Sequence, residues 1–190
     1  MQTNRICLVA ILLLAGPAFA QMPQQATEPA SPHATAVSAA EIKAAVARNP
    51  AGAFSDNVLA VAAIDASPNV GVAVVRRSQV NGQTPPDAIV HDAVTEVYQI
   101  IEGRGILVTG GTLQSAVPLA ADNPVVGEIG PSSVGKSIVG GTRQPVGPGD
   151  IVVIPPHTPH GFVEISTKRI VYTLIRIDPQ KLLKPLANSH

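Results

Sequence analysis

The chain has 190 residues, of which 45% are hydrophobic, and its 13 Lys and Arg residues balance its 13 Asp and Glu residues. This balance, without any basic or acidic block, argues against nucleic acid or an anionic membrane surface as a partner. The single cysteine, Cys7, lies within the first twenty residues, so we expect neither disulfides nor a zinc–thiolate site in the rest of the chain.

Residues 1–20, MQTNRICLVAILLLAGPAFA, have the pattern of a secretory signal peptide. Arg5 precedes an apolar run, and the small residues Ala18 and Ala20 stand before the expected cut after Ala20. The apolar run is too short for a helix that spans a bilayer, which needs about 20 residues. We therefore expect a secreted or periplasmic protein with no membrane contact after cleavage, and one domain in the remaining chain.

A leader and one helix are expected before the main domain. Residues 21–37 are rich in Pro, Ala and Gln without apolar periodicity, which indicates a flexible leader. Residues 38–50 predict a short helix, because Ser38 stands three residues before Glu41, as in a capping box. A narrow apolar stripe should pack this helix on the domain that follows: Ile42, Ala45 and Val46.

Residues 51–182 predict an all-β domain, and 183–190 a C-terminal tail. Short β-rich runs are separated by Gly and Pro: VLAVAAI, VGVAVVRR, EVYQIIEG, GILVTGG, DIVVIP and IVYTLIRI. Because no helical pattern alternates with these runs, a sandwich or jelly-roll barrel is favoured over an α/β fold. The long segment 111–147 is expected to contain one further strand, VVGEI.

Residues 130–137, GPSSVGKS, match the P-loop pattern G-x-x-x-x-G-K-[ST] letter for letter. A P-loop needs a helix after its lysine, because the helix N-terminus and backbone N–H groups bind the phosphates. Here Gly140, Gly141 and Pro145 would break any helix that began at Lys136. We interpret the match as fortuitous, and expect no ATP binding and a turn or lid in its place.

Two short stretches carry candidate catalytic or metal-binding side chains. In VHDAVTEVYQIIEG, His91 precedes Glu96 by five residues, and strand alternation puts Glu96, Tyr98 and Ile100 on one face. In PGDIVVIPPHTPHGF, His157 and His160 follow an apolar strand. Taken singly, such residues are typical of solvated loops and strand ends. Together they indicate a site.

These stretches resemble the two motifs of the cupin superfamily, G-x5-H-x-H-x3-4-E-x6-G and G-x5-P-x-G-x2-H-x3-N. His91, Glu96 and Gly103 match the second His, the Glu and the closing Gly of the first motif, and three residues match the second: Gly149, Pro155 and His160. The chain therefore resembles a small single-domain cupin over roughly residues 58–177. The resemblance implies a cupin-type jelly-roll β-barrel preceded by the short helix.

Four positions depart from the motifs. Ile89 replaces the first histidine, and an aliphatic side chain cannot bind a metal. His157 stands where the second motif has Gly, and Glu164 where it has Asn. Gly82 lies one place from the expected opening glycine. In cupins the segment between the motifs varies most in length, so residues 111–147 resemble an extended version that covers the barrel mouth.

By resemblance, the metal ligands are His91, Glu96 and His160, and the cofactor is a divalent transition metal: Fe, Mn, Ni, Co or Zn. Two imidazoles and one carboxylate leave open positions for a substrate or oxygen. His157 is a candidate fourth ligand, acid/base group or rim residue, with the rim favoured because a turn position beside Pro156 usually points outward. Tyr98 either donates a hydrogen bond to a metal-bound ligand or packs in the core.

The resemblance implies a secreted metal-dependent enzyme, of oxygenase type or lyase/isomerase type, that acts on a small organic substrate inside the barrel. Cupins host several reactions and plain binding proteins on one scaffold. A non-catalytic periplasmic protein that binds a metal or a small ligand is therefore the alternative. The resemblance also leaves a homodimer open.

Overall fold

The computed structural model describes residues 34–48, 53–80 and 88–186 of the chain. The predicted signal peptide and Gly82 lie outside these residues, as do most of the predicted leader and half of the predicted C-terminal tail. Neither helix in the described residues has the length and apolar character needed to cross a membrane.

The N-terminal helix α1 spans Ala39–Ala47 and begins with the predicted capping box. The Ser38 side chain accepts a hydrogen bond from the backbone N–H of Glu41, and the Glu41 carboxylate accepts one from the backbone N–H of Ser38. Ala45 is buried against Val74 and Val171, and Ile42, Val46 and Leu59 pack around them. The predicted helix and its apolar stripe are thereby confirmed.

The remainder of the described chain is mostly β, as predicted. The strands are β1 Phe54–Ala62, β2 Asn69–Val80, β3 Ala88–His91, β4 Thr95–Glu102, β5 Gly105–Thr109, β6 Thr112–Gln114, β7 Val117–Pro118, β8 Ser132–Gly135, β9 Ser137–Val139, β10 Thr142–Val146, β11 Ile151–Ile154 and β12 His160–Asp178. Each of the six β-rich runs found in the sequence overlaps a strand.

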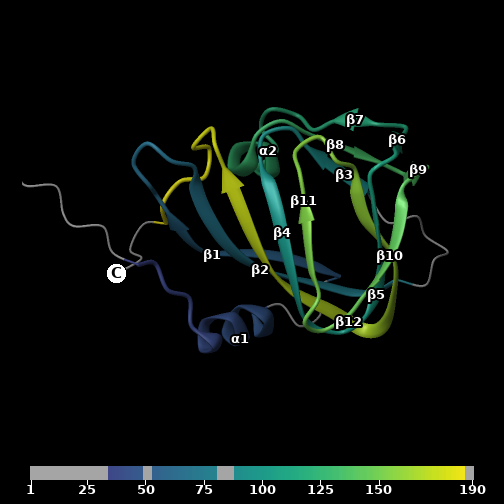
Figure 1. Ribbon diagram of the computed structural model, residues 1–190, viewed down its shortest axis with the longest axis horizontal. Coiled ribbons are helices and arrows are strands. Elements are labelled where there is room, and N and C mark those ends of the chain that lie inside the picture. Colours follow the sequence, from purple (N-terminus) through teal and green to yellow (C-terminus); the bar gives the residue numbers. More distant parts are fainter. Residues whose placement is uncertain (1–33, 49–52, 81–87, 187–190) are drawn as a thin grey trace, which may run out of the picture. The chain divides into compact units, whose positions relative to one another are not determined.

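Strand β12 is long enough to belong to two halves of the sheet (Figure 1). Its residues 160–165 pair with β5, and residues 169–178 pair with β2, with irregular register between the two parts. One half has the order β1-β2-β12-β4-β11, and the other contains β7, β8, β3, β12, β5 and β10. Hydrogen bonds between the described residues do not join β1 to β11, so the barrel is not closed.

The hydrophobic core lies between the two halves. It combines Ala73, Tyr98, Ile154 and Leu174 of the first half with Leu107, Val146 and Phe162 of the second. Burial alternates along β4, because Glu96, Tyr98 and Ile100 are buried while Gln99 and Ile101 are exposed. This jelly-roll arrangement of all-β type agrees with the predicted fold class.

The segment 111–147 differs from its prediction. VVGEI is not a strand: it belongs to helix α2, Pro124–Ile129. Pro124 occupies the first helical turn, and the Asn123 side chain accepts a hydrogen bond from the N–H of Val125, two helix-start features that outweigh the β-branched residues. The GPSSVGKS stretch forms β8 and the first residue of β9, so a strand follows Lys136 where a P-loop has a helix.

Candidate metal centre

His91 ends β3, beside β8, and its ring orientation is fixed from outside the site. The Nδ1 atom lies 2.8 Å from the Oγ of Ser132, and that hydroxyl donates its proton to the carbonyl of Gly130 at 3.0 Å. Because the hydroxyl has only one proton, His91 Nδ1 must be the donor to it. The Nε2 atom of His91 therefore carries a lone pair.

His160 begins β12, directly after the Pro-rich turn, and its tautomer is fixed in the same way. Its Nδ1 lies 2.9 Å from the backbone carbonyl of Thr158, which can only accept a hydrogen bond. The lone pair of His160 is thus also on Nε2. This atom is buried and has no hydrogen-bond partner among the described residues.

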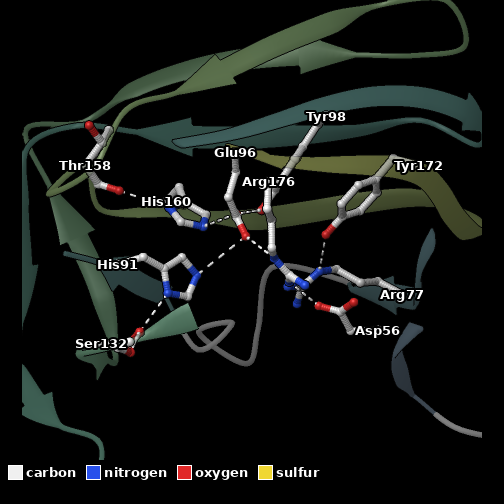
Figure 2. Close-up of polar contacts among 11 residues, drawn as sticks. Asp56, Arg77, His91, Glu96, Tyr98, Ser132, Thr158, His160, Tyr172 and Arg176 are labelled. Carbon is white, nitrogen blue, oxygen red and sulfur yellow. Dashed lines mark hydrogen bonds and ion pairs between the residues drawn. The ribbon is translucent and has the colours of Figure 1, made fainter. Parts of the chain in front are cut away.

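Glu96 faces both imidazoles from β4 (Figure 2). Its carboxylate oxygens lie 3.8 Å from Nε2 of His91 and 3.3 Å from Nε2 of His160. It accepts hydrogen bonds from the Tyr98 hydroxyl at 3.0 Å and from Nε of Arg176 at 3.2 Å. The carboxylate is therefore held from the side opposite the histidines.

The three side chains fit a metal ion. One ligand atom from each of His91, Glu96 and His160 lies within 4.8 Å of the others, and all three residues are buried. Two imidazole lone pairs that face a carboxylate repel it, unless a cation lies between them or the rings are protonated. Imidazoles whose outer N–H is held by a hydroxyl or a carbonyl are characteristic of metal ligands. The structure thus brings the three candidate ligand residues together.

Burial favours a neutral His91, and the groups around Glu96 favour its ionised form. Burial lowers the pKa of His91 to about 4, although the Glu96 carboxylate opposes that shift. Burial alone would raise the pKa of Glu96, but His160, His91 and Arg176 outweigh it and hold this pKa well below its usual range. Burial and the charge of Glu96 raise the pKa of Tyr98, which stays a hydrogen-bond donor. A neutral His91 and an ionised Glu96 are the protonation states that a metal requires of these two residues.

Tyr98 packs in the core, as one of its two predicted roles requires, and also contacts Glu96. Its hydroxyl donates to a carboxylate oxygen of Glu96, and its ring stacks on Tyr172 with centroids 4.4 Å apart. It touches a candidate ligand, which places it beside the site.

His157, predicted as a candidate catalytic residue, is not brought to the metal group. Its side chain is 73% exposed, and its Nδ1 lies 3.3 Å from Asp92. Its backbone has a φ of 60°, the left-handed region that explains the glycine of the cupin motif, and its N–H donates to the carbonyl of His91 at 2.7 Å. The rim position holds the turn against β3, and the roles of fourth ligand and acid/base group find no support.

Three residues of the site were not predicted: Ser132, Arg176 and Asp56. Arg176 is buried beside Glu96, and its Nη2 lies 2.5 Å from a carboxylate oxygen of Asp56. A signal for Arg176 exists in the sequence, because strand alternation places it on the same face as Tyr172 and Leu174. No comparable signal marks Ser132, since β8 itself was not predicted.

Comparisons with known proteins find one family model and several solved structures that are similar to this chain. Residues 134–190 match the family model described as an AraC-like ligand binding domain. No curated protein matches the chain. Similar solved structures include the DMSP lyase DddQ from Ruegeria pomeroyi, at 14% identity and a TM-score of 0.40, over 71% of this chain and 51% of that one. The Fe(II) form of HppE matches at 13% identity and a TM-score of 0.42, over 66% of this chain and 51% of the other.

An oxalate oxidase matches at 14% identity and a TM-score of 0.40, over 68% of this chain and 53% of the oxidase. This chain thus spans about half the length of each of these proteins. At such low identity no residue role passes from them to this chain. The chain is therefore similar to cupins: both motifs occur in order, their candidate ligand residues lie together in a jelly-roll sheet, and the family-model match covers the second motif.

Proposed function

We propose that this protein is a secreted cupin that binds one divalent transition metal through His91, Glu96 and His160 and transforms a small organic molecule beside it. The observation that carries the proposal is the pair of imidazole lone pairs aimed at a buried carboxylate, with one of the two nitrogen atoms lacking any hydrogen-bond partner in the described residues. Iron, manganese, nickel, cobalt and zinc all accept this set of ligand atoms.

When bound, the metal would supply Lewis-acid or redox chemistry at coordination positions that the protein leaves open. The chain's own residues orient the three candidate ligands around these positions. Ser132 and the carbonyl of Thr158 orient the two imidazoles, and Tyr98 and Arg176 hold the carboxylate. Burial of all three ligands restricts water around them. This arrangement is compatible with oxygenase-type and with lyase- or isomerase-type reactions.

The proposal is tested first by metal content and then by turnover. Purified protein should bind one equivalent of metal, and this binding should be lost in Glu96→Gln. Protein loaded with each candidate metal is then assayed for oxygen uptake and product formation on catechols, flavonoids and small diketones. If the protein binds none of these metals, the proposal is refuted.

A binding protein without catalysis is the second candidate, because the matched family model is described as a ligand binding domain. Stoichiometric metal binding without reaction across the panel would favour it. Export, which rests on the pattern in residues 1–20, is a separate part of the proposal. Mass spectrometry of protein from the producing cell should show an N-terminus at Gln21.

A further inference from the structure

Glu96 faces the proposed metal position and is also hydrogen-bonded to a buried cation, the guanidinium of Arg176. Arg176 on β12 lies opposite Glu96 on β4 in the register of the two strands. Its side chain is 6% exposed, and its Nε donates to the carboxylate of Glu96 at 3.2 Å. A divalent ion bound to Glu96 would therefore lie close to a guanidinium that cannot lose its charge.

Asp56 on β1 lies on the other side of this guanidinium (Figure 2). Nη2 of Arg176 donates to its carboxylate, and the Asp56 side chain is 24% exposed. The negative charge of Asp56 offsets the positive charge of Arg176, and the charge of Glu96 is left for a metal. Arg77 lies on the same side of the site, where it donates a hydrogen bond to the hydroxyl of Tyr172. Because Arg77 adds a second positive charge there, the negative charge of Asp56 becomes more important for a nearby metal.

We propose that Asp56 is a positioning residue of the metal centre, which neutralises Arg176 so that Arg176 can hold Glu96 without repelling the metal. This inference rests on the proposed function. Asp56 acts through Arg176 and contributes no ligand. The attraction between Asp56 and Arg176 and the repulsion between Arg176 and the metal act over a few ångströms in a buried site, where charges are only weakly screened.

The test is a cycle of variants in which Co²⁺ affinity is measured by calorimetry. Asp56→Asn removes the charge that offsets Arg176, so Glu96 alone of this pair of carboxylates faces the guanidinium, and the variant is expected to weaken Co²⁺ binding about 10- to 100-fold, the usual range for a residue that supports a ligand. Adding Arg176→Gln removes the repelling charge, so the double variant should bind Co²⁺ more tightly than Asp56→Asn alone. A purely structural role predicts the reverse, because the double variant then loses both supports.

Two further variants serve as controls. Asp56→Glu keeps the charge and should stay within about threefold of the wild-type affinity, well short of the loss expected for a removed support. Glu102→Gln breaks a comparable but exposed ion pair, whose atoms lie 2.7 Å apart between Glu102 and Arg169, and should leave the affinity unchanged.

The outcomes separate this inference from the proposed function. If wild-type protein does not bind Co²⁺ or the other metals, the proposed function fails. If it binds Co²⁺ and Asp56→Asn binds it equally well, or the double variant binds more weakly than Asp56→Asn, the inference about Asp56 is overturned alone. If Asp56→Asn does not fold, the double variant decides: an affinity within about tenfold of wild type supports the inference, and a larger loss overturns it.

Discussion

Replacement of Ser132 by Ala should weaken metal binding although Ser132 cannot contact the metal. The hydroxyl of Ser132 accepts the Nδ1 proton of His91 and donates to Gly130, and the Ser132 residue is 4% exposed. Removing it leaves the His91 N–H and the Gly130 carbonyl without this buried partner, which should cost about 1–3 kcal/mol of unfolding free energy. It also frees the ring of His91 to rotate or to change tautomer.

The expected loss of metal affinity is about 10- to 100-fold, or about 1.4–2.7 kcal/mol. Co²⁺ titration measures it directly, and tyrosine emission gives a second signal, because the chain has no Trp and both of its Tyr residues lie at or next to the site. Ser133→Ala is the matched control: it lies on the same strand with its side chain on the other face, and should change little. Wild-type affinity in Ser132→Ala, or an equal loss in Ser133→Ala, would refute the reasoning.

His160→Ala should abolish stoichiometric metal binding, whereas Lys136→Ala should leave the metal content unchanged. Equilibrium dialysis with ATP and Mg²⁺ should find no nucleotide bound to either variant. ATP binding by the wild-type protein that depends on Lys136 would contradict the interpretation of GPSSVGKS as a fortuitous match. Ser38→Ala should lower the unfolding free energy by about 0.5–2 kcal/mol in urea titrations without changing metal content, and any loss of metal would show that the helix has been misinterpreted. In metal-free protein the unfolding free energy should fall as the pH drops from about 6.5, the ordinary pKa of histidine, towards about 4, the pKa of His91 in the folded state. The reason is that His91 gains a proton in this pH range only in the unfolded chain. A His91→Gln variant should show a shallower fall, and an equal slope would count against the low pKa of His91.

The three candidate ligand residues could be predicted because their signals are local. Two-residue alternation placed Glu96, Tyr98 and Ile100 on one face, and the structure buries all three. The position of His160 after a Pro-rich turn, like that of His91 before a strand, follows the spacing of the cupin motifs. Hydrophobic runs likewise marked the strands that carry most of the core.

The support around the ligands could not be predicted, because it depends on pairing between distant segments. β8 has the sequence SSVG, which lacks apolar alternation and becomes a strand through its pairing with β3. Without that pairing, nothing links Ser132 to His91. In the same segment, β-branched residues favoured a strand in VVGEI, but Asn123 and Pro124 start a helix there. Local propensity decides little when a cap and tertiary contacts favour the other structure.

The most direct test of the metal centre is a crystal structure of Co²⁺-loaded protein with anomalous scattering recorded at the cobalt edge. We predict one strong peak bound by Nε2 of His91, Nε2 of His160 and a carboxylate oxygen of Glu96, at about 2.0–2.2 Å from each. We also expect Nδ1 of His91 still to face Ser132. A cobalt peak elsewhere, or a bound ion that one of these three residues does not touch, would contradict the proposed metal centre.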